Sequence, residues 1–200
     1  MIKNKITPET KTPGMTAGNR KWKSFEDIAD WSSAMIPRLI GSFGLEIFFP
    51  IQYELADLKP NVLGSFGLKQ DEERGVYGVI TISPNVIAKK DILSVLLHEL
   101  IHAHVISNAL VEGSQQQKKV VDGVKELKEM KDQKAQSEKL GEMIIEVEGF
   151  TQKVKEAVDD IKGHQGLFAD ICREVGYGGK MTATEAKPAL VKRLLALDFE

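Results

Sequence analysis

The apolar residues from Asp91 to Val105 cover almost the whole circumference of one predicted helix. This segment contains neither Gly nor Pro, and its large apolar residues are Ile92, Leu93, Val95, Leu96, Leu97, Leu100 and Ile101. A helix that is apolar nearly all round is a buried one. The pattern therefore predicts that a central core helix runs through residues 91–105.

The residues before this helix predict one further helix and three strands. Ser24, followed by Asp27, resembles a capping box, so we expect a helix that runs to about Leu39, with a kink or an end at Pro37. Three segments rich in apolar and β-branched residues then read as strands: 45–56, 61–68 and 76–83. We expect a compact three-stranded antiparallel sheet. If its last strand lay at an edge it could pair with an extended peptide, although ordinary sheet packing explains its sequence equally well.

Narrow apolar stripes among many charged residues distinguish residues 107–162 from the rest of the chain. Apolar residues recur every three to four positions between Gln115 and Lys139, and again after Gly141 and Gly149. Such stripes predict a charged helical hairpin or a short coiled coil inserted into the domain. The insertion either only returns the chain to the core, or also docks a partner or restricts access to a cleft.

Two short amphipathic helices are predicted after the insertion. Phe168, Ile171, Cys172 and Val175 fall on one helical face, which places His164 in the first turn of a new helix. A second helix is expected within 187–199. The predicted class is α+β, with three parts: an arm at 1–23, a compact domain formed by 24–106 and 163–200, and a helical insertion at 107–162.

Composition and charge are those of an ordinary globular protein. No run of 18 apolar residues is present, residues 1–23 contain no apolar h-region of a secretory signal, and a single cysteine cannot form an internal disulfide. We therefore expect a cytoplasmic protein without membrane contact. Residues 1–23 carry a net charge of +5, whereas residues 24–200 carry −7. This flexible basic arm either makes weak contacts with nucleic acid or keeps the terminus solvated.

Two histidines and a glutamate occupy the predicted core helix at the spacing of a zinc hydrolase. His98 and His102 are four residues apart, so they project from the same side of a helix, with Glu99 beside them. Two neutral imidazoles can share one Zn²⁺, and a carboxylate in that place can move the proton of a water molecule. A charged or polar group without a partner is costly in a buried helix. We therefore favour a metal site over a pair of satisfied core histidines.

A hydrolytic zinc needs a third protein ligand and one open position. The other histidines in the sequence are His104 and His164. His104 lies two residues after His102 and points away, so His164 is the favoured third ligand. The rivals are three glutamates: Glu142, Glu146 and Glu148. Tyr177, near several glycines, is a candidate donor to an oxyanion, although such a tyrosine is more often a packing residue.

Three segments resemble those of the SprT-like zinc metallopeptidases. They are Ile82-Ser83-Pro84, Leu93 to Ala103 (LSVLLHELIHA), and Gly163-His164 with Phe168 four residues on. Residues 179–184 resemble in particular the small bacteriophage members of that family. The resemblance covers roughly 25–106 and 163–186 and implies a zincin-like fold, in which a helix and a three-stranded sheet lead into the motif helix. A third histidine then arrives on a later helix.

The resemblance also implies a site and an activity. One Zn²⁺ per chain would be held by His98, His102 and His164, and Glu99 would be the general base of peptide-bond hydrolysis. The implied substrates are proteins or peptides, with DNA-associated proteins as one candidate class, and the implied location is the host cytoplasm if the chain is encoded by a phage.

The chain differs from the family pattern in three respects. Residues 107–162 separate the motif from the third histidine, a single cysteine excludes a zinc ribbon, and Gly166 stands two residues after His164 rather than immediately after it. Two alternatives remain open. One is a zincin with a glutamate ligand that cleaves a repressor-type protein. The other is a non-catalytic interaction module stabilised by zinc, which leaves Glu99 without a use.

Overall fold

The side chain of Ser24 begins the first helix, α1 (Phe25–Phe43), by accepting a hydrogen bond from the backbone N–H of Asp27 at 3.2 Å. Pro37 lies inside this helix and does not end it, so the helix continues four residues beyond the expected limit. Gly44 ends it in the left-handed conformation, with φ of 62°.

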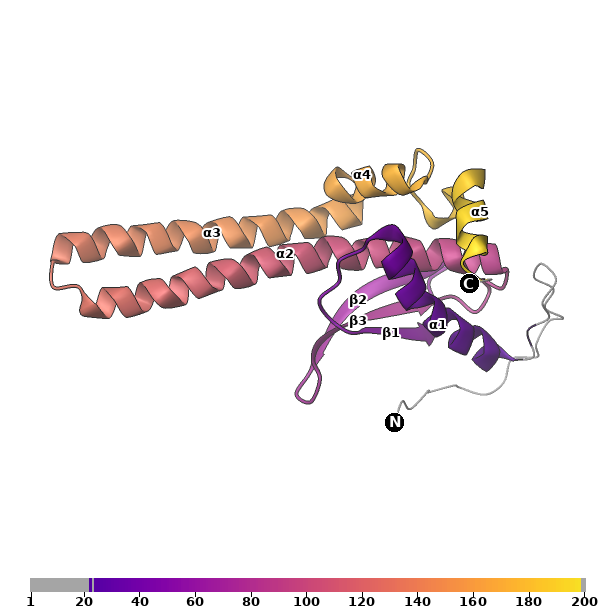
Figure 1. The fold of residues 1–200 in the computed structure, drawn as a ribbon, viewed down its shortest axis with the longest axis horizontal. Helices are drawn as coiled ribbons and strands as arrows, with labels where there is room; N and C mark the ends of the chain where they lie inside the picture. Colours follow the sequence, from indigo (N-terminus) through magenta and orange to yellow (C-terminus); the bar gives the residue numbers. More distant parts are fainter. Residues whose placement is uncertain (1–21, 23, 199–200) are drawn as a thin grey trace.

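The computed structural model describes Trp22 and residues 24–198 of the chain. It confirms the α+β class (Figure 1).

Three strands follow α1 and form one mixed sheet. They are β1 (Ile51–Leu55), β2 (Gly64–Asp71) and β3 (Gly75–Ile82), in the spatial order β1-β3-β2. The expectation of an antiparallel sheet is correct for β2 and β3 but wrong for β1, which pairs with β3 in parallel. The physical reason is the run from Val79 to Ile82, which is apolar except for Thr81, is buried throughout and favours the central position. β3 is therefore not an edge, and the edges are β1 and β2.

The motif helix is longer than the sequence suggested. α2 (Lys89–Glu129) is buried from Ile92 to Ile101 and continues without interruption past residue 106. The change of composition near residue 107 marks the point where α2 leaves the core, not the point where a helix ends. α3 (Gln133–Gly163) returns antiparallel to α2, and the two form a long hairpin that projects from the body (Figure 1).

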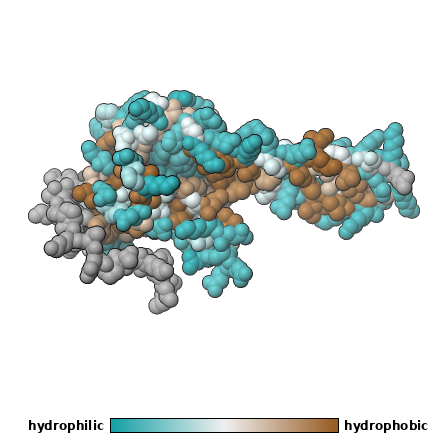
Figure 2. Space-filling model, turned by 180° about the vertical axis from the view of Figure 1, so that it is seen from behind, coloured by the Kyte–Doolittle hydropathy of each residue, from teal (hydrophilic) through white to brown (hydrophobic). Residues whose placement is uncertain are grey.

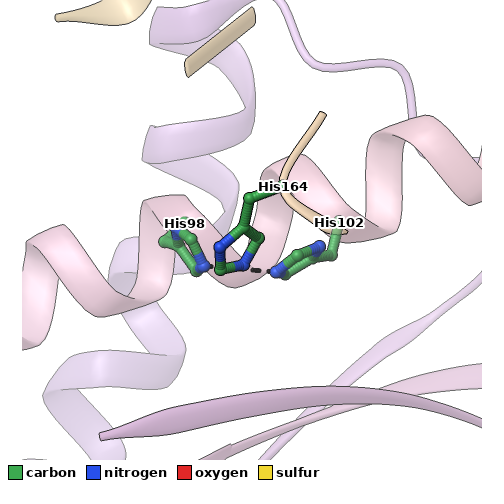
Figure 3. Close-up of side chains that lie close together, drawn as sticks. All are labelled: His98, His102 and His164. Atoms are coloured by element: carbon green, nitrogen blue, oxygen red, sulfur yellow. Dashed lines mark hydrogen bonds between the residues drawn. The ribbon is translucent and has the colours of Figure 1, made fainter. Parts of the chain in front are cut away.

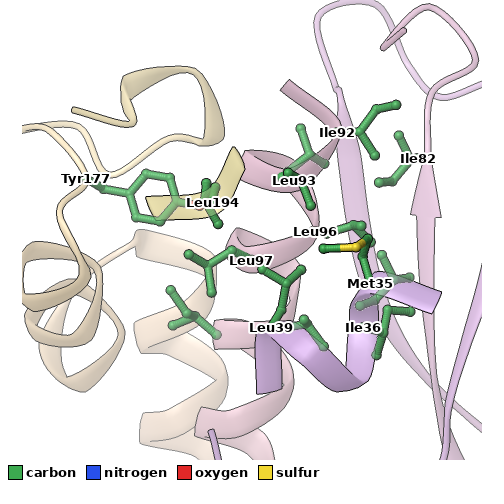
Figure 4. Packing of buried hydrophobic residues seen from close by; sticks show 14 of the residues in the cluster. Met35, Ile36, Leu39, Ile82, Ile92, Leu93, Leu96, Leu97, Tyr177 and Leu194 are labelled. Carbon is green, nitrogen blue, oxygen red and sulfur yellow. The ribbon is translucent and has the colours of Figure 1, made fainter. Parts of the chain in front are cut away.

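The last helices cover the side of α2 that faces away from the sheet (Figure 1). They are α4 (Gly166–Val175) and α5 (Pro188–Ala196), joined by a segment with a short 3₁₀ helix, η1 (Ala183–Glu185). Figure 4 shows the resulting core: Met35, Leu39 and Ile82 contact one side of α2, and Tyr177 and Leu194 the other. α2 is therefore the central element around which the body packs.

The predicted basic arm lies outside the described residues except for Trp22. That side chain is buried, and its Nε1 donates to the carbonyl oxygen of Ile87 at 2.9 Å. Trp22 thus belongs to the body rather than to an arm.

Within the described residues, α2 is the one helix that is long and apolar enough to cross a membrane. However, 78% of its most apolar window is buried in the fold, as in the core helix of a globular protein.

Candidate metal centre

His98 and His102 lie one turn apart on α2, with their Nε2 atoms 3.2 Å from each other. His164, from the junction of α3 and α4, completes a cluster in which one nitrogen from each ring lies within 4.8 Å of the others (Figure 3). Two imidazole nitrogens on a tetrahedral zinc, each about 2.0–2.1 Å from it, would be about 3.3–3.4 Å apart. The cluster therefore has the dimensions of a metal site.

Hydrogen bonding within the protein does not explain the two buried histidines. The Nδ1 atoms of His98 and His102 are buried and have no hydrogen-bond partner among the described residues. The Nε2 atoms of the two rings are instead 3.2 Å from each other. Buried polar groups normally have partners. This arrangement favours a shared cation over a pair of satisfied core histidines.

Burial keeps the three imidazoles neutral. Desolvation, followed by the nearby His164, lowers the pKa of His98 to about 3. Desolvation, followed by His98 and His164, lowers the pKa of His102 to about 2. Desolvation also lowers the pKa of His164. Because a metal binds the neutral imidazole, the site is prepared for a cation at neutral pH.

The sequence suggested that His164 lies in the first turn of α4, and this prediction is wrong. It caps the C-terminus of α3 in a left-handed conformation, with φ of 50°. Asp160 holds this turn: its carbonyl oxygen accepts the N–H groups of His164 and Gln165, and its carboxylate accepts that of Leu167 at 3.1 Å. Gly166 also has a positive φ of 53°, and a Cβ atom there would collide with the Asp160 carboxylate.

Phe168 is a site residue whose role sequence reasoning missed. Its ring stacks on His102, with centroids 4.2 Å apart and 13° between the planes, and on His164, with centroids 5.0 Å apart. Phe168 thus helps to fix the ring orientation of His102, from α2, and of His164, from the junction of α3 and α4. The available signal is its position four residues after His164, on the apolar face of the helix that follows.

Glu99 lies beside the three histidines but outside their cluster. Its Oε2 is 3.9 Å from Nε2 of His102, and the residue is only 5% exposed. Burial raises the pKa of Glu99 to about 8. Gly64, at the start of β2, makes room for this side chain, since a Cβ atom there would come within 2.9 Å of Oε1 of Glu99. The carboxyl group is therefore enclosed between α2 and the edge strand β2.

The remaining candidates lie elsewhere. His104 faces away from the centre, because its Nδ1 accepts from the backbone N–H of Glu46 at 2.9 Å. Tyr177 is buried and its hydroxyl donates to the carbonyl oxygen of Ser94 at 2.5 Å, so that hydroxyl already has an acceptor. Burial is also the main cause of its raised pKa.

The three rival glutamates lie on the projecting part of α3. Glu146, for example, is 3.5 Å from Lys119, which follows His102 by 17 residues, or about 25 Å along α2. The cluster therefore contains His164, the favoured third ligand, and none of the three rival glutamates.

No protein-family model, no curated protein and no solved structure matches this chain. Its function must therefore be argued from the site. Within the described residues, three histidines lie close enough to bind one metal ion, with a buried carboxyl group at their side.

Proposed function

We propose that this protein is a zinc-dependent endopeptidase of the SprT-like type, which holds one Zn²⁺ through His98, His102 and His164. The observation that carries the proposal is the position of Glu99, buried next to a three-imidazole cluster without being part of it. A purely structural zinc site is normally closed by four protein ligands. Three neutral imidazoles with one open position are typical of catalytic zinc.

Bound zinc would supply a Lewis acid that polarises a carbonyl group and lowers the pKa of water. The remaining chemistry belongs to Glu99. Its raised pKa of about 8 is caused by burial, and a nearby cation would favour the carboxylate form. The carboxylate accepts a proton from water as the water oxygen bonds to the scissile carbonyl carbon, and it gives that proton to the amine as the C–N bond breaks.

The edge strand β2 supplies a surface for an extended peptide. It pairs on one side with β3, and Gly64 at its beginning lies directly against Glu99. The free N–H and C=O groups of an edge strand can pair with a substrate backbone independently of its sequence. The condition set for β3, that it lie at an edge, is met by β2 instead. DNA-associated proteins as substrates and a cytoplasmic location stay predictions.

Two measurements on the purified chain test the proposal. Elemental analysis should find about one zinc per chain, and the protein should cleave an unfolded protein such as casein at internal peptide bonds identified by mass spectrometry. The Glu99→Gln variant should keep its zinc and lose cleavage by about 10³-fold or more, because an amide cannot accept the proton. Equal cleavage by both proteins would remove Glu99 from the mechanism.

The projecting hairpin favours a second candidate, a non-catalytic module in which zinc only stabilises the body. In that case neither the wild-type chain nor Glu99→Gln cleaves any protein, while His98→Ala lowers both the zinc content and the melting temperature. Reproducible cleavage that is lost on chelation excludes this candidate.

A further inference from the structure

The hairpin has a poorly filled interior. In the range 108–162 the described residues that are buried are Gly113, Gly123 and Met143. The two glycines give space to single side chains of α3: a Cβ atom on Gly113 would collide with Phe150, and one on Gly123 would press on Met143. Two helices of this length are therefore joined by a thin apolar seam. Helices rely mainly on the burial of an apolar face for their stability.

One face of the outer hairpin is rich in charged residues. It is lined by Lys119, Asp122, Glu126, Lys139, Glu142 and Glu146, together with the seam residues Gly123 and Met143. Ion pairs cross it between Lys119 and Glu146 at 3.5 Å, and between Lys139 and Glu126 at 2.8 Å. Such a face is adapted to water.

The opposite face is apolar and exposed. Of the eleven large apolar side chains that are exposed in the described part of the chain, five lie on it: Val121, Val124, Leu140, Ile144 and Val147. Two hollows of about 410 and 490 Å³ run along this face, the first between Leu110 and Val147, and the second between Val124 and Leu140. Figure 2, seen from behind, shows hydrophobic side chains gathered over the outer half of the hairpin.

One heptad position can be followed on each helix. Leu140, Val147 and Val154 recur every seven residues on α3, and on α2 the same spacing joins Leu110 and Val124 through the polar Gln117. Leu110 and Val154, near the base of the hairpin, are half-buried, and the other four residues are exposed. A strict seven-residue repeat keeps one stripe facing a partner helix along its length. Two such stripes side by side, next to an underfilled seam, are half of a four-helix bundle.

We propose that a second copy of this chain covers this face, so that two hairpins form a four-helix bundle. The area is sufficient: about 20 residues of each helix span roughly 30 Å, and two adjacent helices are roughly 20 Å wide, which gives roughly 600 Å² per copy. That is near the lower limit of stable interfaces.

The charge of the hairpin also fits a second copy. Residues 107–162 contain ten lysines against twelve acidic residues, a net charge of −2, so two hairpins repel each other little. A nucleic acid or an anionic membrane would require a basic surface, which this balance does not provide.

The hairpin offers a matched pair of test residues. Ile144 (52% exposed) and Ile145 (70% exposed) are adjacent on α3, but Ile144 lies next to Leu140 and Val147 on the apolar face, whereas Ile145 lies two residues, or about 200°, from Val147. Ile144→Glu should raise the dissociation constant of the dimer at least about tenfold, because it places a charge in the interface. Ile145→Glu should leave it unchanged.

The full-length chain is first examined by sedimentation velocity and light scattering between about 1 and 200 µM, with the mass compared with twice 22.2 kDa. Circular dichroism and zinc content check that both variants are folded, and Leu140→Gln serves as a milder second variant. A dimer weakened by Ile144→Glu and Leu140→Gln but not by Ile145→Glu is expected. A chain that stays monomeric at 200 µM, an assembly larger than a dimer, or equal weakening by Ile144→Glu and Ile145→Glu would overturn the proposal. All of these results are independent of whether the metal centre binds zinc or is catalytic.

Discussion

At the scale of single residues, the three imidazoles reach the candidate centre from two places: His98 and His102 project from neighbouring turns of α2, and His164 lies at the turn that ends α3. His98, Glu99 and His102 follow from helical spacing alone, because four residues on a helix bring two side chains to the same side. His164 was correctly preferred, but its left-handed position at the end of α3 could not be read from the apolar pattern of α4. The support given by Asp160 is invisible in the sequence, because it depends on the path of the turn.

The ligand set is the first prediction at this scale. His164→Ala should lower zinc affinity by about 100-fold or more, because two imidazoles alone hold zinc much less tightly than three. The matched control is His104→Ala, whose ring contacts the backbone of Glu46 and should leave zinc affinity unchanged. Competition with a chromogenic chelator measures both. Full zinc affinity in His164→Ala would disprove the three-histidine site.

The turn that carries His164 gives a second prediction. Asp160→Ala removes the acceptor of the Leu167 N–H and loosens the turn, so zinc affinity should fall by about tenfold, as is common for residues that orient a metal ligand. Asp159→Ala, one residue earlier and exposed, is the control and should have no effect. The same chelator competition distinguishes them. An equal loss in Asp159→Ala and Asp160→Ala would show that net charge, not the turn, matters.

At the scale of elements, the type of each helix and strand was more predictable than its limits or neighbours. The strands were recognised by composition, but the parallel pairing of β1 depends on which strand is buried on both faces, and that is a property of the assembled sheet. Likewise Pro37 does not end α1, because the helix is packed against α2 and tolerates one missing hydrogen bond. Tertiary packing overrode local preference in both places.

The hairpin gives a prediction at this scale, because its ends and its outer part have different roles. Its base positions His164, whereas the outer part bears the exposed apolar face. Replacing residues 117–146 by a short Gly/Ser turn keeps the contact between Gly113 and Phe150 as the closing pair. We expect unchanged zinc content and a monomeric protein. Loss of zinc in a folded variant would show that the outer hairpin also supports the metal centre.

At the scale of the whole molecule, the centre joins parts that are far apart in the sequence. α2 supplies two ligands and the base, the long excursion through the hairpin supplies the third ligand, and β2 encloses the base. The net effect is that two imidazoles and one carboxyl group are buried together beside the half-buried His164, and the Nδ1 atoms of His98 and His102 have no partner among the described residues. The stability of the metal-free molecule must therefore depend on pH in a defined way.

The last prediction is this pH dependence. His98 and His102 have pKa values lowered from 6.5 to about 3 and 2 in the fold, so below pH 6.5 the unfolded chain binds more protons and stability falls as the pH falls. Glu99 has a pKa raised from 4.5 to about 8, so the folded chain binds more protons between these values and stability falls as the pH rises. The lowered pKa of His164 acts in the same direction as those of His98 and His102. The histidines therefore outweigh the single glutamate below pH 6.5, and Glu99 dominates between 6.5 and 8.

Chelator-treated protein should accordingly be most stable near pH 6.5. Urea unfolding from pH 5 to 9 measures this, and Glu99→Gln is the control that should lose the decline above pH 6.5 while keeping the decline below it. Added zinc should stabilise the wild-type chain most at high pH, since the cation binds neutral imidazoles and favours the Glu99 carboxylate. A metal-free protein equally stable at pH 5 and 6.5 would show that the two histidines are not buried as neutral groups.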